Sequence, residues 1–219
     1  ANGIKSDDYQ GFTRGTPVAM ATTTLNINSD NKSFGISQKF NDLTLGVLKE
    51  NGTFLGNYAN NALINVEGAT TAYVGLNKEY VVDNTTIFGG INLGATKLNV
   101  GESMMTSTDT IFSNSANIGA KYTIDNRQFG MVAGLPVAIT SGSAKFNVPS
   151  NVSADGDIET MTMTSSLASR SREFDLGIFY NLQLSDSATM STFIEKRYNH
   201  SGNSNVTSTG FGISYTANF

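Results

Sequence analysis

Residues 210–219 read Gly-Phe-Gly-Ile-Ser-Tyr-Thr-Ala-Asn-Phe, and this stretch decides the class of fold. An apolar or aromatic side chain stands at every second position from Phe211 to Phe219, with small or polar residues between them. Successive side chains of a β-strand point to opposite sides, so the pattern predicts a strand with one apolar and one polar face.

The same alternation recurs along the chain. Three further stretches show it clearly, at 116–124, 128–140 and 173–184. Eight less regular segments complete the set, at 17–28, 33–40, 43–50, 71–82, 86–100, 143–148, 158–167 and 187–199. The 219 residues then provide about 18 per strand and connection, which suits strands of roughly ten residues. We therefore predict an all-β fold of about 12 strands.

The connections between these segments differ in length. Short links rich in Asn, Asp and Ser stand at 41–42, 83–84, 125–126 and 185–186, and longer segments at 52–70 and 101–115. Outer-membrane barrels alternate short periplasmic turns with longer outer loops in this way. The links at 141–142 and 149–157 do not fit that alternation. We predict a single antiparallel transmembrane β-barrel over 17–219, preceded by a polar linker or lumenal segment at 1–16.

Composition excludes several classes of function. The chain has no cysteine and a single histidine, His200, so thiolate sites and sites with two imidazoles are excluded, and we expect no metal or cofactor. A net charge of −4 gives no electrostatic basis for binding nucleic acid. Charged residues make up 15% of the chain, against about 25% in ordinary soluble domains.

Lipid is the expected neighbour of the apolar faces. The opposite faces carry mainly Gly, Ser, Thr and Asn rather than Lys and Glu, as a barrel interior does. Aromatic residues recur near strand ends, where rings form girdles at a membrane surface: Tyr80, Phe129, Phe174, Tyr198, Phe211 and Phe219. This favours the bacterial outer membrane, although a soluble β-sandwich has the same alternation.

Five charged residues fall on the polar faces of the predicted strands and are candidates for lining the lumen: Lys121, Glu173, Asp175, Glu195 and Arg197. Charges of both signs on one face suit either a network that contacts a peptide in the lumen or ordinary hydrated lining. The sequence leaves both interpretations open.

The C-terminal strand resembles the terminal signal of bacterial outer-membrane proteins, which ends in Phe with apolar residues at every second position before it. The resemblance implies that Phe211, Ile213, Tyr215 and Phe219 form a membrane-insertion signal read by the barrel-insertion machinery. The alternative is that they are ordinary lipid-facing side chains of a closing strand.

The last 85 residues or so carry a second resemblance, through Gly134-Leu135-Pro136, Ser141-Gly142-Ser143-Ala144, Arg172-Glu173-Phe174-Asp175-Leu176, Tyr180 and Arg197-Tyr198-Asn199-His200. These motifs resemble the C-terminal translocator domain of autotransporter-type subtilisin-family (S8) proteases. The resemblance implies a barrel, commonly of twelve strands, that anchors and helps to export the chain's own upstream passenger. No Gly-Thr-Ser nucleophile motif is present, so we expect no enzymatic activity. The N-terminus, Ala1-Asn2-Gly3-Ile4-Lys5, has no apolar run of signal-peptide length, so we expect a mature form or an excised domain.

Two other functions stay open at this stage. One is a free-standing small porin or surface adhesin, with binding carried by the loops at 52–70 and 101–115. The other is a hydrolase built on His200-Ser201, but adjacent residues of a strand point to opposite faces, and a solvated loop histidine is the simpler interpretation.

Overall fold

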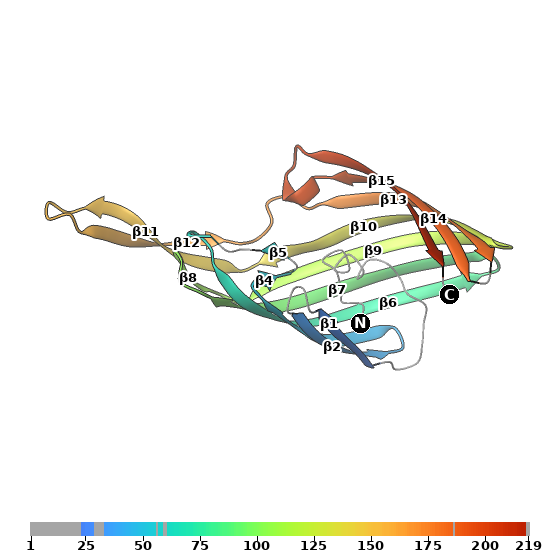
Figure 1. The fold of residues 1–219 in the computed structure, drawn as a ribbon, viewed down its shortest axis with the longest axis horizontal. Coiled ribbons are helices and arrows are strands. Elements are labelled where there is room, and N and C mark those ends of the chain that lie inside the picture. The colour runs from blue at the N-terminus through green and yellow to red at the C-terminus, as the bar shows by residue number, and fades with distance from the viewer. Residues whose placement is uncertain (1–22, 29–32, 56, 59–60, 186, 218–219) are drawn as a thin grey trace.

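The computed structural model describes residues 23–28, 33–55, 57–58, 61–185 and 187–217 of the chain. Ten antiparallel strands form the main sheet, each paired with the next in this order: β1 (Thr23–Asn28), β2 (Ser33–Phe40), β3 (Leu43–Asn51), β6 (Val66–Val82), β7 (Thr85–Val100), β9 (Ile111–Ile124), β10 (Arg127–Ser141), β13 (Phe174–Ser185), β14 (Ala188–Tyr198) and β15 (Thr207–Ala217). The sheet is twisted and curved, with β14 and β15 crossing the direction of β6–β10 steeply (Figure 1). The predicted all-β antiparallel fold is confirmed.

β1 and β15 are the two edges of this sheet, and no described residue of one pairs with the other. Closure into a barrel therefore stays a prediction. The predicted segment 1–16 and the predicted strand start at 17–22 lie outside the described residues.

Each of the twelve predicted segments contains a strand, but ten of these strands, not twelve, belong to the main sheet. β11 (Ser143–Val152) and β12 (Ile158–Ser166) instead form a separate three-stranded sheet with β8 (Met105–Thr108). This hairpin projects beyond one end of the main sheet (Figure 1). β11 does not turn back onto β10. It runs on from β10 past Gly142 and pairs with β8, which precedes β9, so the β9–β10 ladder continues into the smaller sheet.

Gly142 directs the chain out of the main sheet at this point. Its φ is +137°, a conformation that residues with a Cβ rarely adopt, and a Cβ there would lie 3.1 Å from Ile111 Cα. The link at 149–157, which does not fit the predicted alternation of short and long connections, contains the tip of the projecting hairpin. With that hairpin set apart, the short and long connections alternate without exception along the described chain.

Three of the short turns form the same backbone hydrogen bond to a neighbouring strand. Asn41, Asp83 and Asp125 each adopt a φ near +50°, which Asn and Asp tolerate better than other residues with a side chain. The carbonyl of the next residue then accepts a hydrogen bond from the neighbouring strand, with an N···O distance of 2.8 Å in each of three turns. The predicted tight turns at 41–42, 83–84 and 125–126 are confirmed and tied to the sheet.

The opposite end of the sheet holds a small apolar core. Val66, Met105 and Ala144 are buried, and the partly buried side chains packed against them are Phe54, Ile64, Leu98, Val100, Phe146 and Leu167. The short hairpin of β4 (Thr53–Phe54) and β5 (Asn57–Tyr58) belongs to this end. No helix in the described ranges is long and apolar enough to cross a bilayer.

Candidate functional site

One face of the main sheet is apolar and exposed, and we call it the outer face. A continuous register row crosses it from β7 to β15 through Ile87, Ala120, Met131, Ile178, Ile194 and Phe211. The five large side chains of that row are 48–66% exposed. Soluble monomers rarely expose contiguous apolar patches larger than a few hundred Å², so this face fits a nonaqueous neighbour.

Aromatic pairs mark the two ends of the outer face. The rings of Tyr122 and Phe129 lie 5.4 Å apart beside a short turn, and those of Phe174 and Tyr198 lie 6.2 Å apart at the long-loop end. On β9, Phe112 and Tyr122 are ten residues apart on this face, about 33 Å along the strand. With the usual barrel tilt of about 40°, that corresponds to about 25 Å along the membrane normal, the height of a barrel's apolar band.

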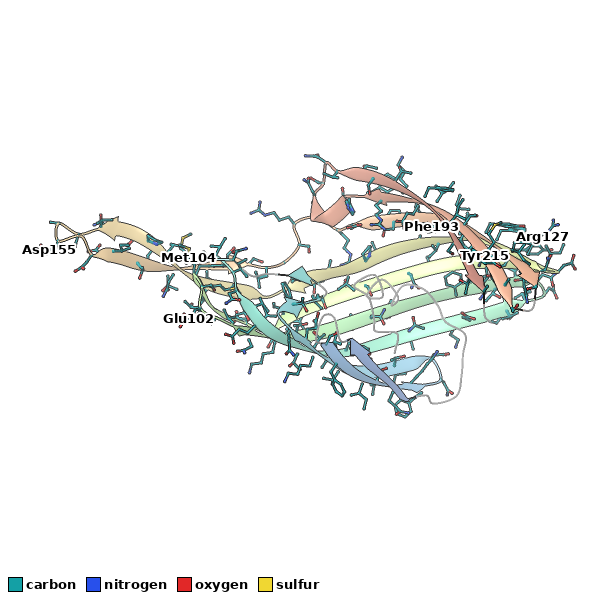
Figure 2. All side chains as sticks on the ribbon, in the orientation of Figure 1. Glu102, Met104, Arg127, Asp155, Phe193 and Tyr215 are labelled. Carbon is teal, nitrogen blue, oxygen red and sulfur yellow. The ribbon has the colours of Figure 1, made fainter. Side chains whose placement is uncertain are left out.

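The residues of the predicted insertion signal lie on this face of β15. Phe211, Ile213 and Tyr215 are 66%, 63% and 65% exposed, and Figure 2 marks Tyr215 close to the short-turn end of the sheet. Phe219 lies outside the described residues. Exposure on an edge strand is compatible with both interpretations of these side chains, so their role as a signal stays a prediction.

Four of the five predicted lumen residues gather on the opposite, inner face. Asp175 on β13 is the register partner of Arg197 on β14, and Glu195 lies two residues from Arg197 on the same face. The guanidinium of Arg197 donates a hydrogen bond to Glu195 Oε1. Glu173 enters from the connection before β13, and its Oε1 lies 3.1 Å from His200 Nδ1. Their role in lining a lumen stays a prediction, and the sequence did not indicate the His200 contact.

Lys121 is separate from this cluster. Asp175 pairs with Gly134, which pairs with Asn117, so Lys121 lies two strands away and four residues further along β9. It belongs to the short-turn end of the inner face. Within the described residues, no group of three or more His, Asp or Glu side chains is arranged to hold a metal ion.

Arg172 fills a gap in the sheet that sequence reasoning missed. Pro136 has no N–H, and the pairing of β10 with β9 shifts register between Leu135 and Ala138. The guanidinium of Arg172 donates to the carbonyls of Asn114 and Leu135, with N···O distances of 3.0 and 3.4 Å. Burial lowers the pKa of this guanidinium from its ordinary value. A proline inside a predicted strand was the available signal for such a break.

Aromatic side chains cover glycines across the inner face. A Cβ added to any of these glycines would lie within 2.2–2.6 Å of the ring on the neighbouring strand, and the pairs are Gly46 with Tyr73, Gly119 with Phe88, Gly130 with Phe179, and Gly212 with Phe193. Each glycine is the direct register partner of its aromatic residue. In these contacts an aromatic ring covers a glycine on the neighbouring strand, an arrangement that stabilises curved sheets.

No protein-family model and no curated protein match the chain. One solved structure is similar, the toluene transporter TodX of P. putida, with 11% sequence identity and a TM-score of 0.41. The match covers 85% of this chain and 59% of that chain, so the present chain spans less than two thirds of the transporter's length.

Proposed function

We propose that the chain is a β-barrel of the bacterial outer membrane that anchors an upstream passenger and supports its export. The observation that carries the membrane part is the outer face, where large apolar side chains are exposed in register across the sheet. In lipid these side chains lose their contact with water, at a gain of about 25 cal/mol per Å² of apolar surface.

Closure is part of this proposal. A bilayer offers no hydrogen-bond partners for unpaired backbone groups, so the edges β1 and β15 must be paired or covered if the sheet spans it. The chain contains no cysteine, which makes closure directly testable. We expect a panel with one cysteine on β1 and one on β15 to yield a crosslink for at least one register, and a panel on β1 and β10 to yield none.

The anchoring and export part depends on the sequence resemblance to autotransporter translocators. It is supported by the charged cluster around Asp175 and Arg197, which offers both signs of charge to a peptide held against the inner face. No enzymatic role is proposed. The His200 imidazole contacts the Glu173 carboxylate, and this contact joins the segment before β13 to the segment after β14.

The small-porin alternative is less well supported. The buried residues Val66 and Met105 pack with Leu98 and Val100, which belong to the inner face of β7, so this corner of the inner face is apolar at the long-loop end. An open pore needs a continuous polar lining.

The first experiment is folding of residues 1–219 with and without detergent. Circular dichroism and the mobility of boiled and unboiled samples on a denaturing gel give the result. We expect a β spectrum and heat-modifiable mobility that depend on detergent. A monodisperse, detergent-free β protein contradicts the membrane proposal.

Export is tested separately with an epitope fused before Ala1 and expressed behind a signal peptide. We expect the epitope to reach the cell surface, where external protease removes it. A matched control that ends after Val206, and so lacks β15, should leave it inside. If the epitope of the full fusion stays periplasmic while the barrel is heat-modifiable, the export proposal is wrong and the membrane proposal stands.

A further inference from the structure

The charged residues of the main sheet are divided unequally between its two faces. The charged side chains in the regular register of the outer face are all basic on the described strands: Lys49, Lys78, Lys97, Arg127 and Lys196. The inner face carries both signs, with Lys39, Lys121 and Arg197 beside Glu50, Glu79, Asp175 and Glu195. The outer face thus combines apolar side chains with positive charge.

Two of these lysines converge at the long-loop end. Lys49 on β3 and Lys97 on β7 are both register partners of Thr70 on β6, so their Cα atoms are two strand spacings apart, about 9.6 Å. All three residues are exposed. The flexible four-carbon stem of lysine allows both ammonium groups to meet one anion beside the Thr70 hydroxyl.

Neither lysine forms an ion pair with a described carboxylate. The ion pairs among the described residues join Lys78 to Asp42, Arg197 to Glu195 and His200 to Glu173. The nearest acidic residue on β6 is Glu67, in the register shift at the start of the strand, and its Oε2 accepts a hydrogen bond from Asn99 at 3.0 Å. It lies further from the apolar band than the lysine row.

The height of the lysines on the sheet matches that of lipid head groups. Ala95 pairs with Phe112, the aromatic residue at the loop end of the apolar band, and Lys97 lies two residues beyond Ala95, about 7 Å along the strand. The row directly below the lysines is Val47, Ala72 and Ala95, followed by the row Leu45, Val74 and Leu93. A molecule seated here meets positive charge at one end and apolar surface at the other.

We infer that Lys49, Thr70 and Lys97 form a binding site for the phosphate of a lipid head group in the leaflet at the long-loop end, with the acyl chains lying on the apolar rows below. The inference rests on the proposed function, because it places the outer face in a membrane. A soluble anion does not account for the apolar rows, so the occupant is a lipid rather than free phosphate. Each lysine near an anionic lipid surface strengthens binding by about fivefold.

The test is native mass spectrometry of the full chain from mixed micelles of neutral detergent with equal amounts of phosphatidylglycerol and phosphatidylcholine. We expect the unmodified chain to retain phosphatidylglycerol, and K49Q/K97Q to bind it about 25-fold more weakly. The matched control K39Q/K121Q removes the same charge from the inner face and should retain the lipid as the unmodified chain does. A titration with inorganic phosphate should not displace it.

Equal loss in both double variants, or displacement by inorganic phosphate at concentrations near that of the lipid, would overturn the site. So would no preference for phosphatidylglycerol in a chain that folds in detergent, a result that leaves the membrane proposal intact. If the chain folds without detergent, the proposed function fails first, and that result is recognised before any lipid is added.

Discussion

Replacement of Ile118 by lysine distinguishes a lipid-facing sheet from a water-facing one. Ile118 is 63% exposed on the outer face of β9. It lies four residues from Tyr122 and six from Phe112, about 13 and 20 Å along the strand. With a tilt of about 40°, these distances correspond to about 10 and 15 Å along the membrane normal. Ile118 therefore lies within a few Å of the bilayer midplane.

The expected cost follows from that position. A lysine on the lipid face of a barrel lowers the free energy of unfolding by about 2–4 kcal/mol at the midplane. This corresponds to about 30- to 700-fold in the folding equilibrium, since each 1.4 kcal/mol is tenfold. On a water-exposed sheet, an exposed isoleucine replaced by lysine changes stability by about 0.5 kcal/mol or less.

The measurement is urea unfolding in phosphatidylcholine vesicles, followed by far-UV circular dichroism and by gel mobility. The matched control is Ser191→Lys, on the inner face of β14 between Asn181 and Ser214. We expect Ile118→Lys to be destabilised strongly and Ser191→Lys by about 0.5 kcal/mol or less. Equal effects of the two substitutions would refute the assignment of the faces.

Three further outcomes test the structure itself. Arg172→Gln should lower the free energy of unfolding by about 1–3 kcal/mol, because it leaves two backbone carbonyls without their donor; unchanged urea stability would show that water replaces it. Gly212→Val should lower the free energy of unfolding by about 1–3 kcal/mol, because its Cβ would lie 2.2 Å from Phe193 Cε1. Phe193→Ala should relieve part of that loss in the double variant, and full additivity of the two substitutions contradicts the contact. Removal of residues 150–159 should leave heat-modifiable mobility unchanged, since they belong to the hairpin outside the main sheet; loss of that mobility would mean that the hairpin is needed for the barrel.

Much of the fold was predictable because strand geometry acts locally. A period of two fixes which side chains share a face, so the outer positions of β9, β13 and β15 follow from the sequence alone, including Phe211 and Ile213. The turns at 41–42 and 83–84 were also predictable, because Asn and Asp tolerate positive φ.

The candidate site was predictable only in part. The alternation along each strand places Asp175, Glu195 and Arg197 on the inner face. Which of them lie side by side depends on the register between strands. That register also separates Lys121 from the cluster and brings Lys49 and Lys97 to either side of Thr70, although they are distant in sequence.

The sequence by itself determined the all-β class, the two chemically different faces of each strand and the positions of the short turns. Tertiary structure decided the number of strands in the main sheet. The side-chain pattern of β11 and β12 does not show which strands they pair with. β8 precedes β9 and β11 follows β10, so pairing of β9 with β10 brings β8 and β11 side by side, and β12 then pairs with β11. It also decided the role of Arg172, because the unpaired carbonyls that it satisfies exist only where Pro136 meets β9.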